Sequence, residues 1–102
     1  MKHIRRYDKI DSKIEELSEY LQEFFDKHNI TQVIDESKAP STDFYWIMYP
    51  TYISICGKTN GIPFYESYHI YKDLLNLKSQ LEKRLSKEID IIPGFTIDIM
   101  LR

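Results

Sequence analysis

Hydrophobic and polar residues follow their clearest pattern in the middle of the chain, in the stretch DFYWIMYPTYISICGKTNGIPFYE from Asp43 to Glu66. Aromatic and β-branched runs are interrupted there by Pro50-Thr51 and by Asn60-Gly61, and runs bounded by turn residues in this way are typical of strands. Asn-Gly between two such runs is a strong signal for a hairpin. The stretch therefore predicts a three-stranded meander, with its last strand over residues 62–66.

Side chains alternate across a strand, so the turns decide which residues share a face of the sheet. If Pro50 and Thr51 form the first loop, one face is apolar and should pack on the core, and its residues are Phe44, Trp46, Met48, Ile53, Ile55 and Phe64. The opposite face carries phenol groups, and its residues are Tyr45, Ile47, Tyr49, Tyr52, Ser54, Cys56 and Tyr65. Because proline cannot supply the positive φ of a type I′ turn, we expect a longer type I turn with a bulge. A slip of one residue at that turn would exchange the two faces.

Helical periodicity flanks the meander on both sides. The first apolar stripe predicts a helix over 8–29 with Asn29 as a left-handed C-cap, and its residues are Ile10, Ile14, Leu17, Leu21, Phe24 and His28. The second stripe predicts a helix over about 67–88, and its residues are Ile70, Leu74, Leu77, Leu81 and Leu85. Residues 30–35 and 95–101 predict two further strands. The expected order is α-β-β-β-β-α-β, a two-layer α+β domain with a mainly antiparallel sheet and two amphipathic helices.

Length and charge narrow the class of protein. At 102 residues we expect one domain over 1–102, whose first seven residues, 1–7, form a basic N-terminal arm. The net charge of −2 does not indicate nucleic acid or an anionic membrane as the partner. We expect a cytoplasmic protein, because Cys56 has no second cysteine to pair with and no signal peptide or membrane-spanning run is present. Fifteen isoleucines, ten lysines and a single alanine are typical of an AT-rich genome, as in many phages and mobile elements.

Catalytic and metal-binding patterns are missing from the sequence. His3, His28, His69 and Cys56 do not have the spacing of a metal site. A cysteine inside a strand is typically an inert thiol, and the segment GKTNG lacks the preceding glycine of a phosphate-binding loop. We therefore expect no catalytic residue, no metal and no cofactor.

Two surfaces are candidates for partner binding: the tyrosine face and an acidic stripe on the first helix. If both helices pack on the apolar face of the sheet, the tyrosines are exposed as a contact surface; if a helix covers them, they are ordinary core. The acidic stripe is either a solvated surface or a docking face for a basic partner. The predicted partner-binding residues are Tyr45, Ile47, Tyr49, Tyr52, Tyr65, Glu15, Glu19 and Glu23. We expect a non-enzymatic binding module that acts through protein–protein contact, most simply as a homodimer, in the role of an accessory or inhibitory protein of a phage or mobile element.

Two other functions stay open at this stage. A nucleic-acid-binding accessory protein would use the basic arm and stack bases on the sheet aromatics, although the meander offers only Lys58 to phosphates. An enzyme or small-ligand binder would need a pocket between sheet and helices, and its expected lining residues are Tyr65, Tyr68, His69 and Trp46.

Overall fold

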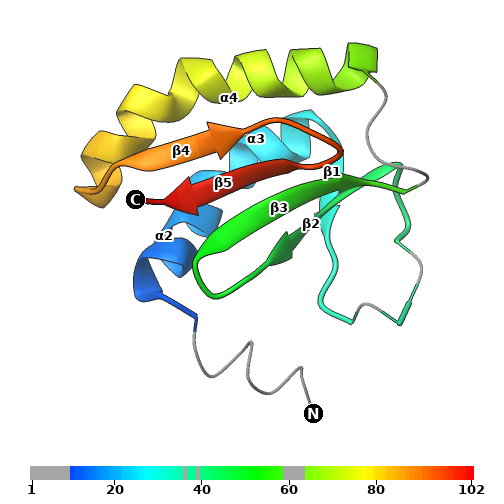
Figure 1. Cartoon of the computed structure of the whole chain (residues 1–102). Coiled ribbons are helices and arrows are strands. Elements are labelled where there is room, and N and C mark those ends of the chain that lie inside the picture. Colours follow the sequence, from blue (N-terminus) through cyan, green and yellow to red (C-terminus); the bar gives the residue numbers. More distant parts are fainter. Residues whose placement is uncertain (1–9, 36, 39, 59–63) are drawn as a thin grey trace.

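The structure, a computed structural model, describes residues 10–35, 37, 38, 40–58 and 64–102, and of residues 64–66 the backbone alone. Its helices are α2 (Ser12–Tyr20), α3 (Gln22–Lys27) and α4 (Phe64–Leu85). Its strands are β1 (Ile30–Gln32), β2 (Phe44–Met48), β3 (Tyr52–Gly57), β4 (Ile89–Ile92) and β5 (Ile97–Leu101) (Figure 1). The chain forms a small α+β domain with a five-stranded, mostly antiparallel sheet and helices, so the predicted fold class is confirmed.

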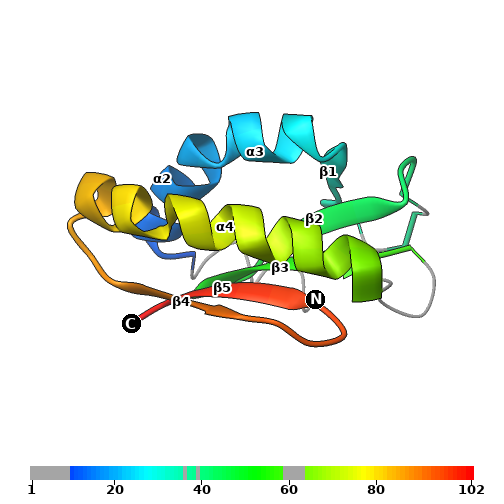
Figure 2. The same cartoon turned by 90° about the horizontal axis from the view of Figure 1, so that it is seen from above.

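The strands lie in the order β1-β2-β3-β5-β4. Only β1 and β2 pair in parallel, and the other three pairings are antiparallel. The helices lie on one side of the sheet, and α4 runs alongside β4 (Figures 1 and 2). Within the part of the chain that the structure describes, the other side of the sheet carries no helix.

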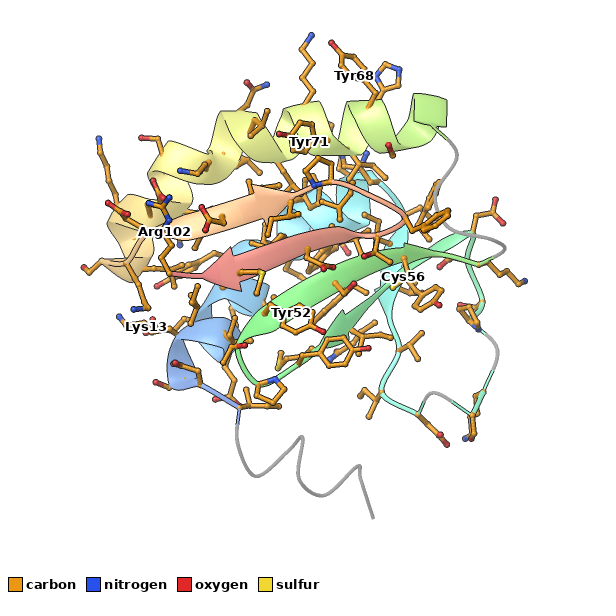
Figure 3. All side chains as sticks on the ribbon, viewed as in Figure 1. Lys13, Tyr52, Cys56, Tyr68, Tyr71 and Arg102 are labelled. Atoms are coloured by element: carbon orange, nitrogen blue, oxygen red, sulfur yellow. The ribbon has the colours of Figure 1, made fainter. Side chains whose placement is uncertain are left out.

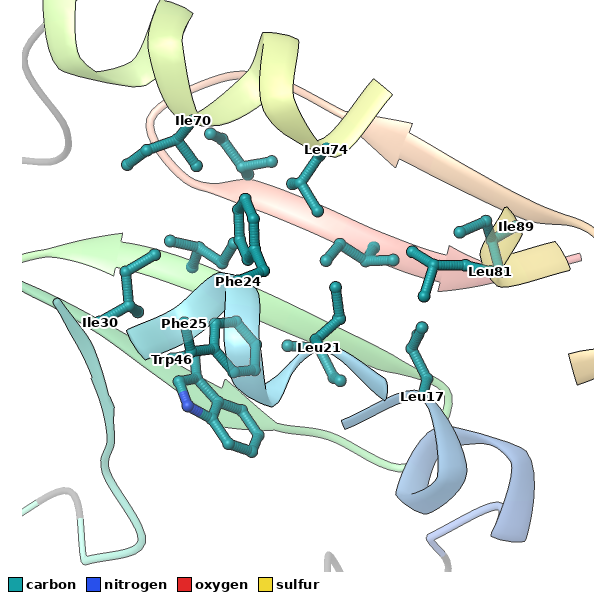
Figure 4. Close-up of a cluster of buried hydrophobic side chains, with 14 of the residues drawn as sticks. Leu17, Leu21, Phe24, Phe25, Ile30, Trp46, Ile70, Leu74, Leu81 and Ile89 are labelled. Atoms are coloured by element: carbon teal, nitrogen blue, oxygen red, sulfur yellow. The ribbon is translucent and has the colours of Figure 1, made fainter. Parts of the chain in front are cut away.

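The core lies between the helical layer and the apolar face of the sheet (Figure 4). The predicted first stripe is buried, with Ile14, Leu17 and Leu21 fully inaccessible. Phe25 stacks on Trp46 with ring centroids 4.6 Å apart, which joins α3 to β2. Ile53 and Ile55 are fully buried, and Phe44 and Met48 pack against the same cluster. The predicted inward set of β2 and β3 is therefore confirmed.

Local sequence explains where the helices start and stop. The Asp11 carboxylate accepts a hydrogen bond from the Lys13 amide at 2.8 Å, an ordinary N-cap. The predicted single helix is divided at Leu21, whose backbone leaves helical geometry at φ −90° and ψ 0°. Asn29 has φ 56°, so it forms the left-handed helix end predicted from its sequence position. None of the helices in the described ranges is long and apolar enough to cross a membrane.

The turn between β2 and β3 differs from the expected longer loop. The Tyr49 amide donates to the Tyr52 carbonyl at 2.8 Å, and Ile47 pairs with Ser54, so Pro50 and Thr51 alone form the turn. Neither turn residue has positive φ. The prediction of a bulged type I connection is wrong, and the simple register that places Tyr45 opposite Cys56 is found.

The predicted strand over 62–66 is also wrong. Residues from Phe64 onward belong to α4, so the expected pairings of Cys56 with Tyr65 and of Gly57 with Phe64 do not form. Proline is favoured at helix starts, and Pro63 directly precedes this helix in the sequence. The fifth strand is instead β4, which follows α4 and forms a hairpin with β5 around Pro93-Gly94. The expected Asn60-Gly61 turn and the basic arm lie outside the described residues.

Candidate binding face

The side of the sheet opposite the helices is the candidate functional site, and we call it the open face. Its members follow from the strand register, because paired residues point to the same side. Figure 3 shows Tyr52 and Cys56 on this side of β3. The open face comprises Tyr45, Ile47, Tyr49, Tyr52, Ser54, Cys56, Asp90, Ile92, Asp98 and Met100.

The tyrosines form the aromatic half of the open face. The rings of Tyr49 and Tyr52 stack with centroids 4.6 Å apart and planes 15° apart. These two tyrosines and Tyr45 are half-buried, whereas Ile47 is only 7% exposed. Burial raises the pKa of the Tyr52 phenol, with smaller contributions from Asp98 and Cys56. The tyrosines are thus covered by none of the described helices and are not fully exposed, and the stacking of Tyr49 on Tyr52 holds these two rings against each other.

A connecting segment borders this aromatic half. Val33, Lys38 and Pro40, from the segment between β1 and β2, surround a cavity of about 150 Å³ together with Tyr45 and Ile47. The low exposure of Ile47 fits this position beside the segment. A partner that approaches the open face would therefore contact the rings from the side of β3 and β5.

A hydrogen-bonded polar cluster lies at the centre of the open face. The Ser54 hydroxyl donates to Asp98 Oδ1 at 2.7 Å, and the Thr96 hydroxyl donates to the same oxygen at 3.0 Å. Ser54 is 6% exposed and is the buried polar residue of the sheet, while Asp98 is half-buried. Two hydroxyl groups therefore fix the Asp98 carboxylate and use one of its two oxygens.

Besides these two hydroxyl groups, Asp98 has apolar and aromatic neighbours on the open face. Ile92 pairs with Asp98 across β4 and β5 and is 47% exposed. Tyr52 is its diagonal neighbour on β3, and Met100 follows it on the same face of β5. Such diagonal neighbours are about 7–8 Å apart, within reach of an aromatic side chain. A carboxylate beside aromatic and aliphatic side chains can bind a cation whose apolar stem packs on those neighbours.

No protein-family model, curated protein or solved structure matches this chain. The open face can therefore be judged only by its own chemistry. The five strands contain no lysine or arginine and two aspartates, Asp90 and Asp98. Asp90 is paired with Arg102, whose Nε lies 3.1 Å from Oδ1. The sheet itself thus offers aromatic, apolar and acidic groups, which suit a protein partner better than a phosphate backbone.

The structure brings together half of the predicted partner-binding residues. Tyr45, Ile47, Tyr49 and Tyr52 share the open face as predicted. The backbone of Tyr65 belongs to α4 and not to the sheet, and its side chain lies outside the described part. Its assignment to the tyrosine face is therefore wrong.

The predicted acidic stripe lies in the helical layer. Glu15 and Glu19 of α2 and Glu23 of α3 are exposed, and their helices lie on the other side of the sheet from the open face (Figure 2). Glu23 borders a groove of about 240 Å³ between α3 and α4, where the Arg84 guanidinium lies 3.9 Å from the centre of the Tyr20 ring. The stripe and the open face thus belong to different layers of the fold.

A charged cluster joins α3 to α4 near the same groove. His28 Nε2 lies 2.8 Å from Asp73 Oδ2, and Lys27 Nζ donates to that oxygen at 3.1 Å. The hydrogen bond with His28 is the main cause of the lowered pKa of Asp73. His69 lines a second hollow together with Lys27, His28 and Asp73. Within the ranges the structure describes, however, no group of three His, Cys, Asp or Glu residues could hold a metal ion.

The expected small-ligand pocket does not form from its described residues. Trp46 is 4% exposed and stacked on Phe25 in the core, whereas Tyr68 is 51% exposed on α4 and points away from the sheet (Figure 3). Asp98 was not among the site residues predicted from the sequence. A signal was present in the sequence, because the alternation of residues 95–101 places Asp98 on the opposite face of the strand from Ile97 and Ile99.

Proposed function

We propose that this protein is a non-enzymatic binding module that acts through protein–protein contact at the open face. The observation that carries the proposal is the stacked pair Tyr49–Tyr52, with Tyr45 nearby, on a sheet face that α2, α3 and α4 leave uncovered. Tyrosine is enriched in interfaces and in the residues that dominate binding energy. Rings that neighbours already hold lose little side-chain entropy on binding, which favours affinity.

Composition supports a more specific role. The high isoleucine and lysine content with one alanine fits an AT-rich genome, and the lone Cys56 fits a reducing compartment. We therefore assign the protein to the cytoplasm, as an accessory or inhibitory protein of a phage or mobile element. The contact, and not a reaction, would be its mode of action.

A second copy of the chain is the first partner to test, because a two-fold axis lets one face meet itself. Sedimentation velocity over a range of protein concentrations would compare the wild type with the double variant Tyr49→Ala/Tyr52→Ala. We expect the variant to weaken association by about 2 kcal/mol, roughly thirtyfold in Kd, because it removes both stacked rings. Tyr68→Ala is the matched control, since Tyr68 is an exposed tyrosine on α4.

The outcomes separate the possibilities. Association that is lost in the double variant and kept in Tyr68→Ala supports the open face as the contact. Association that survives in both variants contradicts it. Circular dichroism must show that the double variant is folded, because an unfolded one would identify the two rings as part of the core. A wild type that stays monomeric leaves another protein as the partner.

A further inference from the structure

Asp98 gives the open face a fixed negative charge that the described structure does not neutralise. The ion pairs of the described residues involve Glu16, Asp73, Glu82, Glu88 and Asp90, and none includes Asp98. Asp90, the other carboxylate of the face, already has Arg102. A half-buried carboxylate without a cation is less stable than a paired one, so this position favours a positively charged ligand.

The geometry of the carboxylate defines how such a ligand would bind. Ser54 and Thr96 both donate to Oδ1, and the distances of 2.7 and 3.0 Å place this oxygen firmly. An ionised carboxylate has about four lone-pair positions, so the two on Oδ2 stay available. The two hydroxyl donors thus occupy one oxygen and leave the other for an incoming donor.

The neighbours of Asp98 suit a flat cation with an apolar stem. Tyr52 supplies an aromatic ring on β3. Met100 pairs with Tyr52 and follows Asp98 on the same face of β5, and Ile92 pairs with Asp98 on β4. A guanidinium is planar, is weakly hydrated, and both stacks on aromatic rings and donates to carboxylates. An ammonium is a more strongly hydrated point charge, which loses more on entering such surroundings.

We propose that the open face binds an arginine side chain of a partner protein, whose guanidinium donates to Asp98 Oδ2 and lies against the Tyr52 ring. This inference rests on the proposed function, because it names the group that the partner contributes to the same surface. The stem of the arginine packs on Met100 and Ile92. Specificity for the partner then comes from one charge-assisted hydrogen bond inside an apolar border.

The test uses the full chain labelled with ¹⁵N and a capped glycine–arginine–glycine tripeptide as the probe. We expect saturable amide shifts at Tyr52, Ser54, Asp98 and Met100, because these residues line the site. The same tripeptide with citrulline in place of arginine keeps the shape and loses the charge, and it should bind at least tenfold more weakly. The affinity of the corresponding lysine tripeptide should lie between those of the arginine and citrulline tripeptides.

Two variants locate the charge that the probe recognises. Asp98→Asn keeps an oxygen that can accept from Ser54 and Thr96, so the fold should persist while affinity for the arginine probe falls at least fivefold. Glu19→Gln removes the same charge from the exposed helical stripe, and its affinity should stay within twofold of the wild type. If Asp98→Asn does not fold, Tyr52→Leu is the alternative variant. It should lower the affinity for the arginine probe about threefold, because the contact with the ring is lost.

Equal binding of the arginine and citrulline probes would overturn the proposal. It would also be overturned by full affinity in folded Asp98→Asn, or by shifts confined to Glu15, Glu19 and Glu23. These results leave the proposed function standing if association still depends on Tyr49 and Tyr52. Association that does not depend on those two tyrosines would instead contradict the proposed function, whether or not the arginine probe binds.

Discussion

At the scale of single residues, the contact of His28 with Asp73 shows how a side-chain pair ties two helices together. His28 stands just after α3 and packs on the Phe24 ring with centroids 4.8 Å apart, while Asp73 lies on α4. Their 2.8 Å hydrogen bond is supplemented by Lys27. The side chains of His28 and Asp73 are 18% and 24% exposed, so water screens the pair only in part.

Asp73→Asn should lower stability by roughly 1 kcal/mol at neutral pH, because it removes the charge from hydrogen bonds with His28 and Lys27. The pKa of Asp73 is lowered in the folded protein, so its contribution is present above the unfolded pKa and is lost as pH falls through the folded value. The gap between wild type and variant should therefore narrow as the pH falls below 3.8, the ordinary pKa of an aspartate.

Urea unfolding at neutral and acidic pH measures both effects. Asp26→Asn is the control, since exposed Asp26 only accepts a 3.3 Å hydrogen bond from Gln22. A gap between wild type and Asp73→Asn that is equal at both pH values would show that the Asp73 charge does not stabilise the fold.

Residue-scale features could be predicted from the sequence only where they are local. Asn29 could be identified as a helix end because its chemistry acts on the adjacent backbone, and the N-cap at Asp11 is a contact of the same local kind. The Ser54–Asp98 and His28–Asp73 contacts join residues 44 and 45 positions apart. Only the pairing of β3 with β5 and the packing of α3 on α4 bring them together, and neither follows from a local pattern.

At the scale of elements, alternation within β2 and β3 determined which side chains turn inward. The apolar runs Phe44–Met48 and Tyr52–Gly57 could be assigned to strands, and their faces to core and surface, from the period of two. Strand partners could not be assigned. Ile89–Ile92 is only four residues long and is followed by a proline, so its sequence pattern did not distinguish a strand from a turn. This segment, and not residues 62–66, forms the fifth strand of the sheet.

Substitutions at adjacent positions of β3 test this alternation. Ile55→Ala should destabilise the protein by about 3 kcal/mol, because Ile55 is fully buried and its removal leaves a cavity. Cys56→Ala should cost less than about 1 kcal/mol, since Cys56 is half-exposed on the open face and loses a single atom. Urea unfolding of the two variants measures the difference, and equal losses would contradict the assigned faces.

At the scale of the whole molecule, the layers separate two kinds of surface. The helical layer carries the exposed glutamates and a groove with compensating charges, whereas the open face carries rings, aliphatic groups and the carboxylate of Asp98. The five strands contain no lysine or arginine. This distribution favours a protein partner at the sheet over a nucleic acid.

A short single-stranded oligonucleotide should therefore show no retardation with the full chain at low salt. Phosphate contacts through lysine and arginine dominate such binding, and they weaken steeply as salt rises. Retardation that disappears with added salt, and that is lost when Lys2, Arg5 and Arg6 are replaced by alanine, would support nucleic-acid binding through the basic arm instead.

The open face as a contact surface is tested most directly by affinity capture with three tagged baits: the wild type, Tyr49→Ala/Tyr52→Ala and Tyr68→Ala. Each bait is incubated with the same cell extract and with an untagged second copy, and the retained proteins are quantified by mass spectrometry. We predict a protein that the wild type and Tyr68→Ala retain equally and that the folded double variant loses at least tenfold. Equal retention of every captured protein by all three baits would contradict a binding role for the open face.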